Sequence, residues 1–250
     1  MANLEQIKKL NLKYNKASAF TRSIKTFSIN ESLDSKNIEL SIQNNISSLG
    51  TNFIQYFDEG KDADVALLFI DICDFSSKNS TLNGKQISAF FDEYYDLVIP
   101  IIYEFGGEID KIIGDGIICL FGQPFLNKSL NECIIEADKC AKKIIVETKK
   151  KDKFKSKVAF HFGKINYFRN KSAFYNELTI VGKPLTELFR LESISENEKI
   201  NYFVKYSFVS NWNENLNNNS SLWTLEGIKP ISTDLKGVDY KYTQTNKYFI

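Results

Sequence analysis

Apolar positions change their spacing twice along the central part of the chain, and each change predicts an element. Residues 65–70 are all apolar, which is typical of a central strand covered on both faces. Residues 84–105 then place apolar side chains at helical spacing ahead of a glycine pair, which predicts a long helix. Two short apolar runs flank Asp115–Gly116, and Asp-Gly between such runs predicts a β-hairpin with its turn there.

The second half of the chain continues the alternation of helices and strands. Residues 130–150 have the pattern of an amphipathic helix, residues 156–165 and 176–182 read as strands joined by a polar arm, and residues 183–195 begin a further helix. Pro184 falls in the first turn of that helix, where proline is favoured. This order predicts an α+β fold, in which helices pack on one face of a mixed sheet.

The two ends of this pattern are less regular. Residues 1–60 are rich in Asn, Ser and Lys and are expected to form a helical extension that docks on the main domain, residues 61–250, or on a dimer partner. The segment 211–221 is rich in asparagine and predicts a loop.

Composition narrows the range of partners. The 250 residues are 43% hydrophobic, enough to fill a core, and 32 basic against 31 acidic residues give a net charge of +1. Such a balance predicts no nucleic-acid partner and favours a small ligand. Four cysteines without CxxC spacing favour a reducing cytosol. Because no apolar run is long enough for a membrane span, we expect a cytoplasmic protein with no membrane partner.

Several common nucleotide and metal motifs are missing. His161 is the one histidine and reads as a packed or hydrogen-bonded core residue, and neither an HExxH site nor a GKS/T phosphate loop occurs. The Gly-Gly-Glu at residues 106–108 approaches the GG(D/E)EF signature of diguanylate cyclases. In those enzymes the signature forms the hairpin turn, whereas here the glycines end a helix and the turn is predicted later.

Two acidic residues at the ends of apolar strands are the strongest candidates for chemistry. Asp71 follows the first strand and Asp115 lies at the predicted turn, so the two carboxylates meet if the strand lies beside the hairpin. Adjacent carboxylates repel unless a cation neutralises them, and Mg²⁺ or Mn²⁺ suits such a site. Taken singly, Asp115 reads as a turn residue and Asp71 as a cap; together they favour a metal site.

Four segments, at residues 69–76, 106–122, 178–193 and 235–237, resemble in order and spacing the catalytic domain of class III nucleotidyl cyclases. The resemblance covers about residues 62–250 and implies a ferredoxin-like, palm-type sheet with helices packed on it. It implies that Asp71 and Asp115 bind two divalent cations with help from the backbone of Ile72. The backbone at Phe75 and Ser76 would approach the phosphates.

The same resemblance assigns substrate contacts elsewhere in the chain. Lys111 and Thr179 match the positions that read the base, and Lys236 matches a lysine that holds the triphosphate. Each residue also has a plainer interpretation, with Lys111 a solvated strand residue and Thr179 a β-former.

Arg190 matches the arginine that stabilises the transition state. Only three of the 32 basic residues are arginines, and the planar guanidinium suits bidentate phosphate contact, although an ion pair with Glu187 or Glu192 is a competing interpretation. The chain departs from the usual pattern nearby, because Thr186 stands where asparagine is common and Lys183 where aspartate is common. Threonine can donate one hydrogen bond to a ribose or phosphate oxygen but is shorter than asparagine, so the resemblance assigns Thr186 to the catalytic position in an altered form.

In the cyclase family the metal residues and the base-reading residues come from different subunits. The resemblance therefore implies a head-to-tail homodimer that converts a nucleoside triphosphate into a 3′,5′-cyclic nucleotide and pyrophosphate. Lys111 and Thr179 would favour ATP. The short architecture and the altered motif at Thr186 instead resemble stand-alone pyrimidine cyclases of Pycsar antiphage signalling, which favours UTP or CTP. The remaining alternatives are an adenylate cyclase and a degenerate, nucleotide-binding regulatory module.

Overall fold

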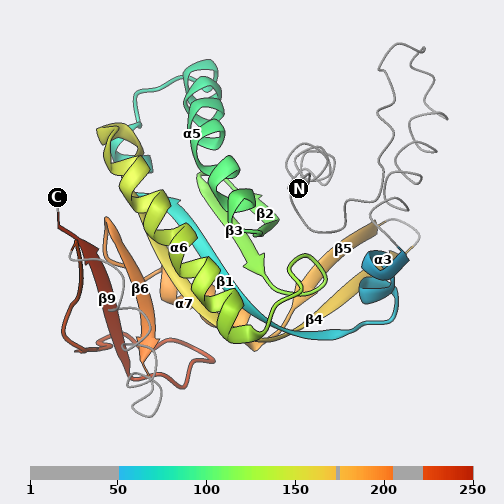
Figure 1. Cartoon of the computed structure of the whole chain (residues 1–250). Helices are drawn as coiled ribbons and strands as arrows, with labels where there is room; N and C mark the ends of the chain where they lie inside the picture. Colours follow the sequence, from blue (N-terminus) through green and yellow to red (C-terminus); the bar gives the residue numbers. More distant parts are fainter. Residues whose placement is uncertain (1–50, 173–174, 205–221, 250) are drawn as a thin grey trace, which may run out of the picture.

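A single mixed sheet organises the part of the chain that the computed structural model describes, residues 51–172, 175–204 and 222–249 (Figure 1). Its strands lie in the order β2-β3-β1-β4-β6-β9-β7, with β5 added to β4 and β8 to β9. The strands are β1 Asp62–Ile72, β2 Glu108–Ile113, β3 Gly116–Phe121, β4 Ser156–Ser172, β5 Tyr175–Val181, β6 Lys199–Val204, β7 Trp223–Leu225, β8 Lys229–Pro230 and β9 Tyr242–Tyr248. Because β4 and β6 run parallel while β1 pairs antiparallel with both of its neighbours, the sheet is mixed, as predicted.

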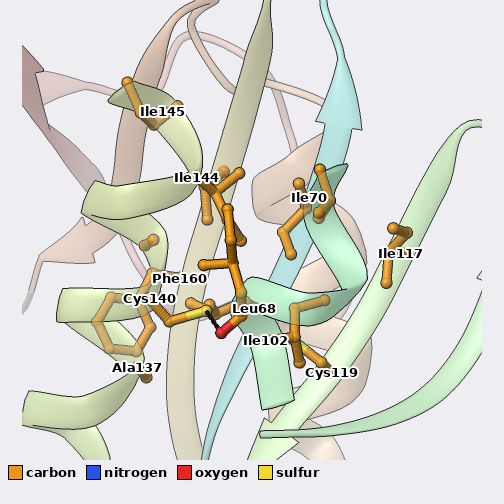
Figure 2. Close-up of a cluster of buried hydrophobic side chains, with 14 of the residues drawn as sticks. Leu68, Ile70, Ile102, Ile117, Cys119, Ala137, Cys140, Ile144, Ile145 and Phe160 are labelled. Carbon is orange, nitrogen blue, oxygen red and sulfur yellow. Dashed lines mark hydrogen bonds between the residues drawn. The ribbon is translucent and has the colours of Figure 1, made fainter. Parts of the chain in front are cut away.

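Two long helices, α5 (Gly84–Glu104) and α6 (Leu130–Lys149), cover one face of the sheet. Each begins with a capping box, in which two side chains accept hydrogen bonds from free backbone amides at the start of the helix. The pair is Asn83 and Gln86 in α5, and Ser129 and Glu132 in α6. Their apolar faces pack on alternate residues of β1, and Figure 2 shows side chains of α6 meeting those of β1 and β3. Cys119, Cys133 and Cys140 are buried free thiols in this core, so these cysteines pack as small apolar residues.

The opposite face of the sheet is covered by α7 (Lys183–Glu192), so the expectation of helices on one face was wrong. Leu185, Leu188 and Leu191 of α7 pack on the other set of β1 residues, among them Leu67 and Phe69. A strand with an unbroken apolar run needs cover on both faces, and α7 supplies the second cover. Pro184 lies in the first turn of α7, as predicted.

The β2–β3 hairpin forms, but its turn lies one residue earlier than predicted. Ile113 pairs with Gly116, so Gly114 and Asp115 are the two turn residues. Gly114 has a φ of +60°, a backbone conformation that glycine adopts without a steric penalty. Gly116 instead starts β3 under the ring of Phe69, where an added Cβ would lie 2.5 Å from a ring carbon. Asp115 therefore stays in the turn, as the sequence indicated, and Gly116 belongs to the strand.

The segment before β1 ends in a helix, α3 (Thr51–Asp58), that packs on β4. The rings of Phe57 and Tyr167 lie 4.8 Å apart, and Asp58 forms an ion pair with Arg169. The predicted arm between two strands is a continuous ladder, in which β4 pairs with β5 from Asn166 opposite Val181 onward. Expectations for residues 1–50 and for the loop 211–221 lie outside the described residues.

Two short elements complete the description. Helix α4 covers Phe75–Lys78, and a 3-10 turn, η2, covers Asp152–Phe154 before β4. None of the helices in the described ranges combines the length and the apolar character that crossing a bilayer requires. His161 is 4% exposed and lies 3.0 Å from Glu187 through Nε2, so the prediction of a hydrogen-bonded core histidine is confirmed.

Candidate active site

The end of β1 and the turn of the β2–β3 hairpin meet at one edge of the sheet. β1 pairs with β3 up to Ile70 opposite Ile117, which places Asp71 beside the turn that contains Asp115. The two carboxyl groups are close enough for each to affect the pKa of the other. The expectation that Asp71 and Asp115 come together is therefore confirmed in geometry.

Two acidic groups this close disturb each other's ionisation. Burial, and after it the charge of Asp115, raise the pKa of Asp71 to about 7, although the charge of Lys157 acts in the opposite direction. Burial also raises the pKa of Asp115 above its ordinary value. The pair thus holds a proton more tightly than free carboxylates do, which is the behaviour of two like charges without full compensation.

A lysine and a glutamate that sequence reasoning missed complete the edge. Lys157 faces Asp71 across the β1–β4 pairing, and its ammonium lies 3.4 Å from Asp71 Oδ2 and 2.8 Å from Glu192 Oε1. Glu192 is the last residue of α7, so this ion pair also ties the helix to the sheet edge. In the sequence, Lys157 is only a lysine near the start of a predicted strand, and Glu192 is only a glutamate near the end of a predicted helix. Neither position differs from that of an ordinary surface charge.

The donor set of this edge fits divalent cations. Two carboxylates whose protonation is favoured by burial and mutual repulsion gain most from a doubly charged ion. Across the described ranges, no group of three or more His, Cys, Asp or Glu side chains has the arrangement of a protein-only metal cage. Asp71 and Asp115 would therefore hold Mg²⁺ or Mn²⁺ with open positions left for other oxygen ligands, as Mg²⁺ sites with substrate phosphates commonly have.

The chain turns sharply directly after β1. Ile72 ends the strand with its side chain buried, and Asp74 has a positive φ of 58° that directs the backbone into α4. Phe75 packs its ring against Phe90 and Phe91 of α5, at centroid distances of 5.3 and 4.9 Å, whereas Ser76 is exposed. The Phe75 ring is thus a structural anchor, and the contacts expected of the Ile72, Phe75 and Ser76 backbones stay predictions.

The two predicted base-reading residues lie on different strands. Lys111 is on β2 and forms an ion pair of 3.2 Å with the adjacent Asp110. Thr179 is on β5, partly buried, opposite Phe168 of β4. Both are strand residues, which agrees with either interpretation given above, and their contact with a base stays a prediction.

The predicted catalytic residues are exposed on the outer side of α7. Thr186 and Arg190 are one helical turn apart and solvent-accessible. Glu187 pairs with His161 and Lys183, and Glu192 pairs with Lys157. Neither glutamate forms an ion pair with Arg190 in the described part of the chain. Lys236 is exposed in a turn that Val238 closes by donating to the carbonyl of Leu235.

The structure brings some of the predicted residues together and leaves others apart. Asp71 and Asp115 lie at the same sheet edge, and Ile72 and Phe75 follow Asp71 in the chain. Within the ranges that the structure describes, no hydrogen bond or ion pair joins Arg190 or Lys236 to either aspartate. A single chain thus presents a carboxylate edge and, separately, an exposed arginine face.

One curated protein resembles the chain in sequence. The terminal-differentiation specific adenylate cyclase of Dictyostelium discoideum is 31% identical over 91 residues, which are 36% of this chain and 4% of that protein. The chain thus spans a small fraction of this relative. No protein-family model matches the chain.

Solved structures show the same fold over most of the chain. The adenylyl cyclase CyaB from P. aeruginosa matches with a TM-score of 0.58 and 17% identity, covering 74% of this chain and 94% of that one. The guanylate cyclase domain of RhGC from Catenaria anguillulae, solved in complex with GTP, matches with a TM-score of 0.59 and 17% identity, covering 76% of this chain and 100% of that one. The described chain therefore has the mixed α+β fold of adenylyl and guanylyl cyclase catalytic domains.

Proposed function

We propose that this protein is a metal-dependent nucleotidyl cyclase, which converts a nucleoside triphosphate into a 3′,5′-cyclic nucleotide and pyrophosphate. The observation that carries the proposal is the meeting of Asp71 and Asp115 at the sheet edge of a cyclase fold. A protein that only binds nucleotide has little need for two repelling carboxylates, because each lowers stability in the absence of a cation.

The residues of this chain divide the work between two surfaces. Asp71 and Asp115 would hold two divalent cations, Mn²⁺ or Mg²⁺, with the Ile72 backbone. Bound there, such ions lower the pKa of an attacking hydroxyl and neutralise charge on the triphosphate. Lys157, already at the edge, carries positive charge beside the same carboxylates.

The second surface is the exposed face of α7. Arg190 would stabilise the negative charge that develops on the phosphate, and Thr186 would donate one hydrogen bond. Because both are exposed and neither contacts the aspartates in the described chain, we propose a head-to-tail homodimer in which α7 of one subunit faces the carboxylate edge of the other. Lys236 would contact the triphosphate from the same subunit as Arg190.

The base is a finer proposal. We favour a pyrimidine, UTP before CTP, because Thr186 departs from the purine cyclase pattern and resembles the altered motif of antiphage pyrimidine cyclases, which also suggests a second messenger in antiviral signalling. ATP is the second candidate, supported by the sequence likeness to an adenylate cyclase and by Lys111 and Thr179. Incubating the purified chain with Mn²⁺ and each of the four nucleoside triphosphates, with products identified by mass spectrometry, distinguishes them. Cyclic AMP as the dominant product would overturn the pyrimidine assignment.

The activity itself is tested by removing both carboxylates. Asp71→Ala combined with Asp115→Ala is expected to abolish the cyclic product. The circular dichroism spectrum should stay that of the wild type, and the unfolding transition should stay cooperative. The matched control, Asp92→Ala with Asp96→Ala, removes the same charge from exposed positions of α5 and is expected to keep full activity. Unchanged product formation in the Asp71/Asp115 variant would refute the metal site. A wild type that forms no cyclic product from any of the four nucleotides would leave a degenerate binding module as the better explanation.

A further inference from the structure

Helix α5 contacts both of the segments that carry the proposed metal ligands. On the side of the hairpin, the hydroxyl of Tyr95 donates to the carbonyl of Gly114 at 2.6 Å. On the side of β1, the ring of Phe91 lies 4.9 Å from that of Phe75, which follows Asp71 by four residues. Phe91 and Tyr95 are themselves stacked, with centroids 5.7 Å apart and planes 11° from parallel. One pair of rings on one helix therefore links the two segments.

The carbonyl that accepts the hydrogen bond of Tyr95 lies in the hairpin turn, directly before Asp115. In a two-residue hairpin turn, the carbonyl of the first turn residue has no partner in the strand ladder. The Gly114 carbonyl belongs to the peptide bond that precedes Asp115, so holding this carbonyl fixes the plane from which the Asp115 side chain projects. Gly114 itself has a positive φ of +60° and no Cβ, and this freedom leaves the turn without side-chain restraint at that position.

Tyr95 is suited to act as a permanent donor. Burial, followed by the negative charge of Asp115, raises the pKa of Tyr95 to about 12, so the phenol keeps its proton through the neutral range. A neighbouring tyrosine, Tyr94, points instead into the core, where its hydroxyl lies 3.0 Å from Ser156 Oγ.

We propose that Tyr95 is a positioning residue for the metal site, which orients Asp115 through the Gly114 carbonyl without contacting the metal or the substrate. This inference rests on the proposed function, because it assigns a role toward the cations of that site. Side chains that orient metal ligands in this indirect way commonly change metal affinity by about 10-fold to 100-fold when they are removed.

Tyr95→Phe removes the hydroxyl and keeps the stacked ring. Mn²⁺ binding to the full chain is measured by isothermal titration calorimetry without nucleotide, for the wild type, Tyr95→Phe and the control Tyr103→Phe. Tyr103 lies on the same helix and donates to Glu108 at 3.2 Å, away from the turn. We expect the Kd for Mn²⁺ to be about 10-fold higher in Tyr95→Phe than in the wild type and unchanged in Tyr103→Phe.

Hydrogen exchange supplies a second readout that needs no metal. In the metal-free protein, the peptide that spans residues 112–118 is expected to exchange faster in Tyr95→Phe than in the wild type, with peptides of β6 and β9 unchanged. If the wild type binds Mn²⁺ and Tyr95→Phe binds it with an equal Kd, the positioning role is overturned and the metal site is supported. A wild type that binds no Mn²⁺ would overturn the proposed metal site and this inference with it.

Discussion

Replacing Asp71 with asparagine is expected to stabilise the metal-free protein at alkaline pH while abolishing activity. Asparagine keeps the size of the side chain and removes its charge. In the folded protein burial and the charge of Asp115 raise the pKa of Asp71 from 3.8 to about 7, so ionising this group opposes folding. Stability from this group is full below the unfolded-state pKa and is lost as pH rises toward 7. The Asp71→Asn variant has no such loss.

The magnitude follows from that shift. A change of about three pKa units corresponds to about 4 kcal/mol at 1.36 kcal/mol per unit. Because the Asp71 side chain is 18% exposed, solvent screens part of this cost, and we expect a net gain of about 2 kcal/mol above pH 7. Well below the unfolded-state pKa of 3.8 the carboxyl is protonated in both states, so the variant and the wild type should there have equal free energies of unfolding.

Urea unfolding in the presence of a chelator, at steps between about pH 5 and about pH 8, measures this difference. Excess Mn²⁺ should reverse the order, because binding at about 100 times the Kd stabilises the wild type by about 2.7 kcal/mol and the variant loses a ligand. Asp96→Asn, on the exposed side of α5, is the matched control and should show no pH-dependent gain. If Asp71→Asn gave no gain at alkaline pH in chelator, the reasoning about two uncompensated carboxylates would be refuted.

Two further predictions concern the packing and ionisation of the scaffold. Gly116→Ala should lower the free energy of unfolding by about 1–3 kcal/mol, because the new Cβ would lie 2.5 Å from the Phe69 ring. Gly84→Ala, with no atom within 4 Å, should stay within about 0.5 kcal/mol in the same urea titration. Glu108 is 4% exposed and burial raises its pKa well above the usual range, so Glu108→Gln should gain stability over the wild type as pH rises above about 4.5. Equal stability of wild type and Glu108→Gln across the pH range, by the same titration, would contradict this.

The sequence predicted the elements well where periodicity is local. The apolar run of β1, the helical spacing of α5 and α6, and Pro184 at the start of α7 are properties of short segments, and each is confirmed. The hairpin turn was misplaced by one residue, because Asp-Gly and Gly-Asp are both acceptable turn pairs and the choice is made by packing. Phe69 of β1, which is distant in sequence but adjacent to β3 in the sheet, covers Gly116 and leaves no room for a Cβ there.

The candidate site shows the same division. Two acidic residues at strand ends could be selected from the sequence, since apolar runs that end in aspartate are visible without a fold. Lys157 and Glu192 could not be selected, because a lysine on a strand and a glutamate at a helix end have no distinctive pattern. Tyr95 was hidden in a run of helical residues, and only the hydrogen bond to Gly114 distinguishes it.

The sequence by itself determined the order of helices and strands and the pair Asp71 and Asp115, because these depend on the spacing of residues along one segment. The tertiary structure decided which face of the sheet α7 covers, which carbonyl accepts the hydrogen bond of Tyr95, and that the Lys157 side chain lies opposite Asp71. These contacts join residues far apart in the chain, and their geometry follows from strand register and from the packing of two cores, one on each face of the sheet.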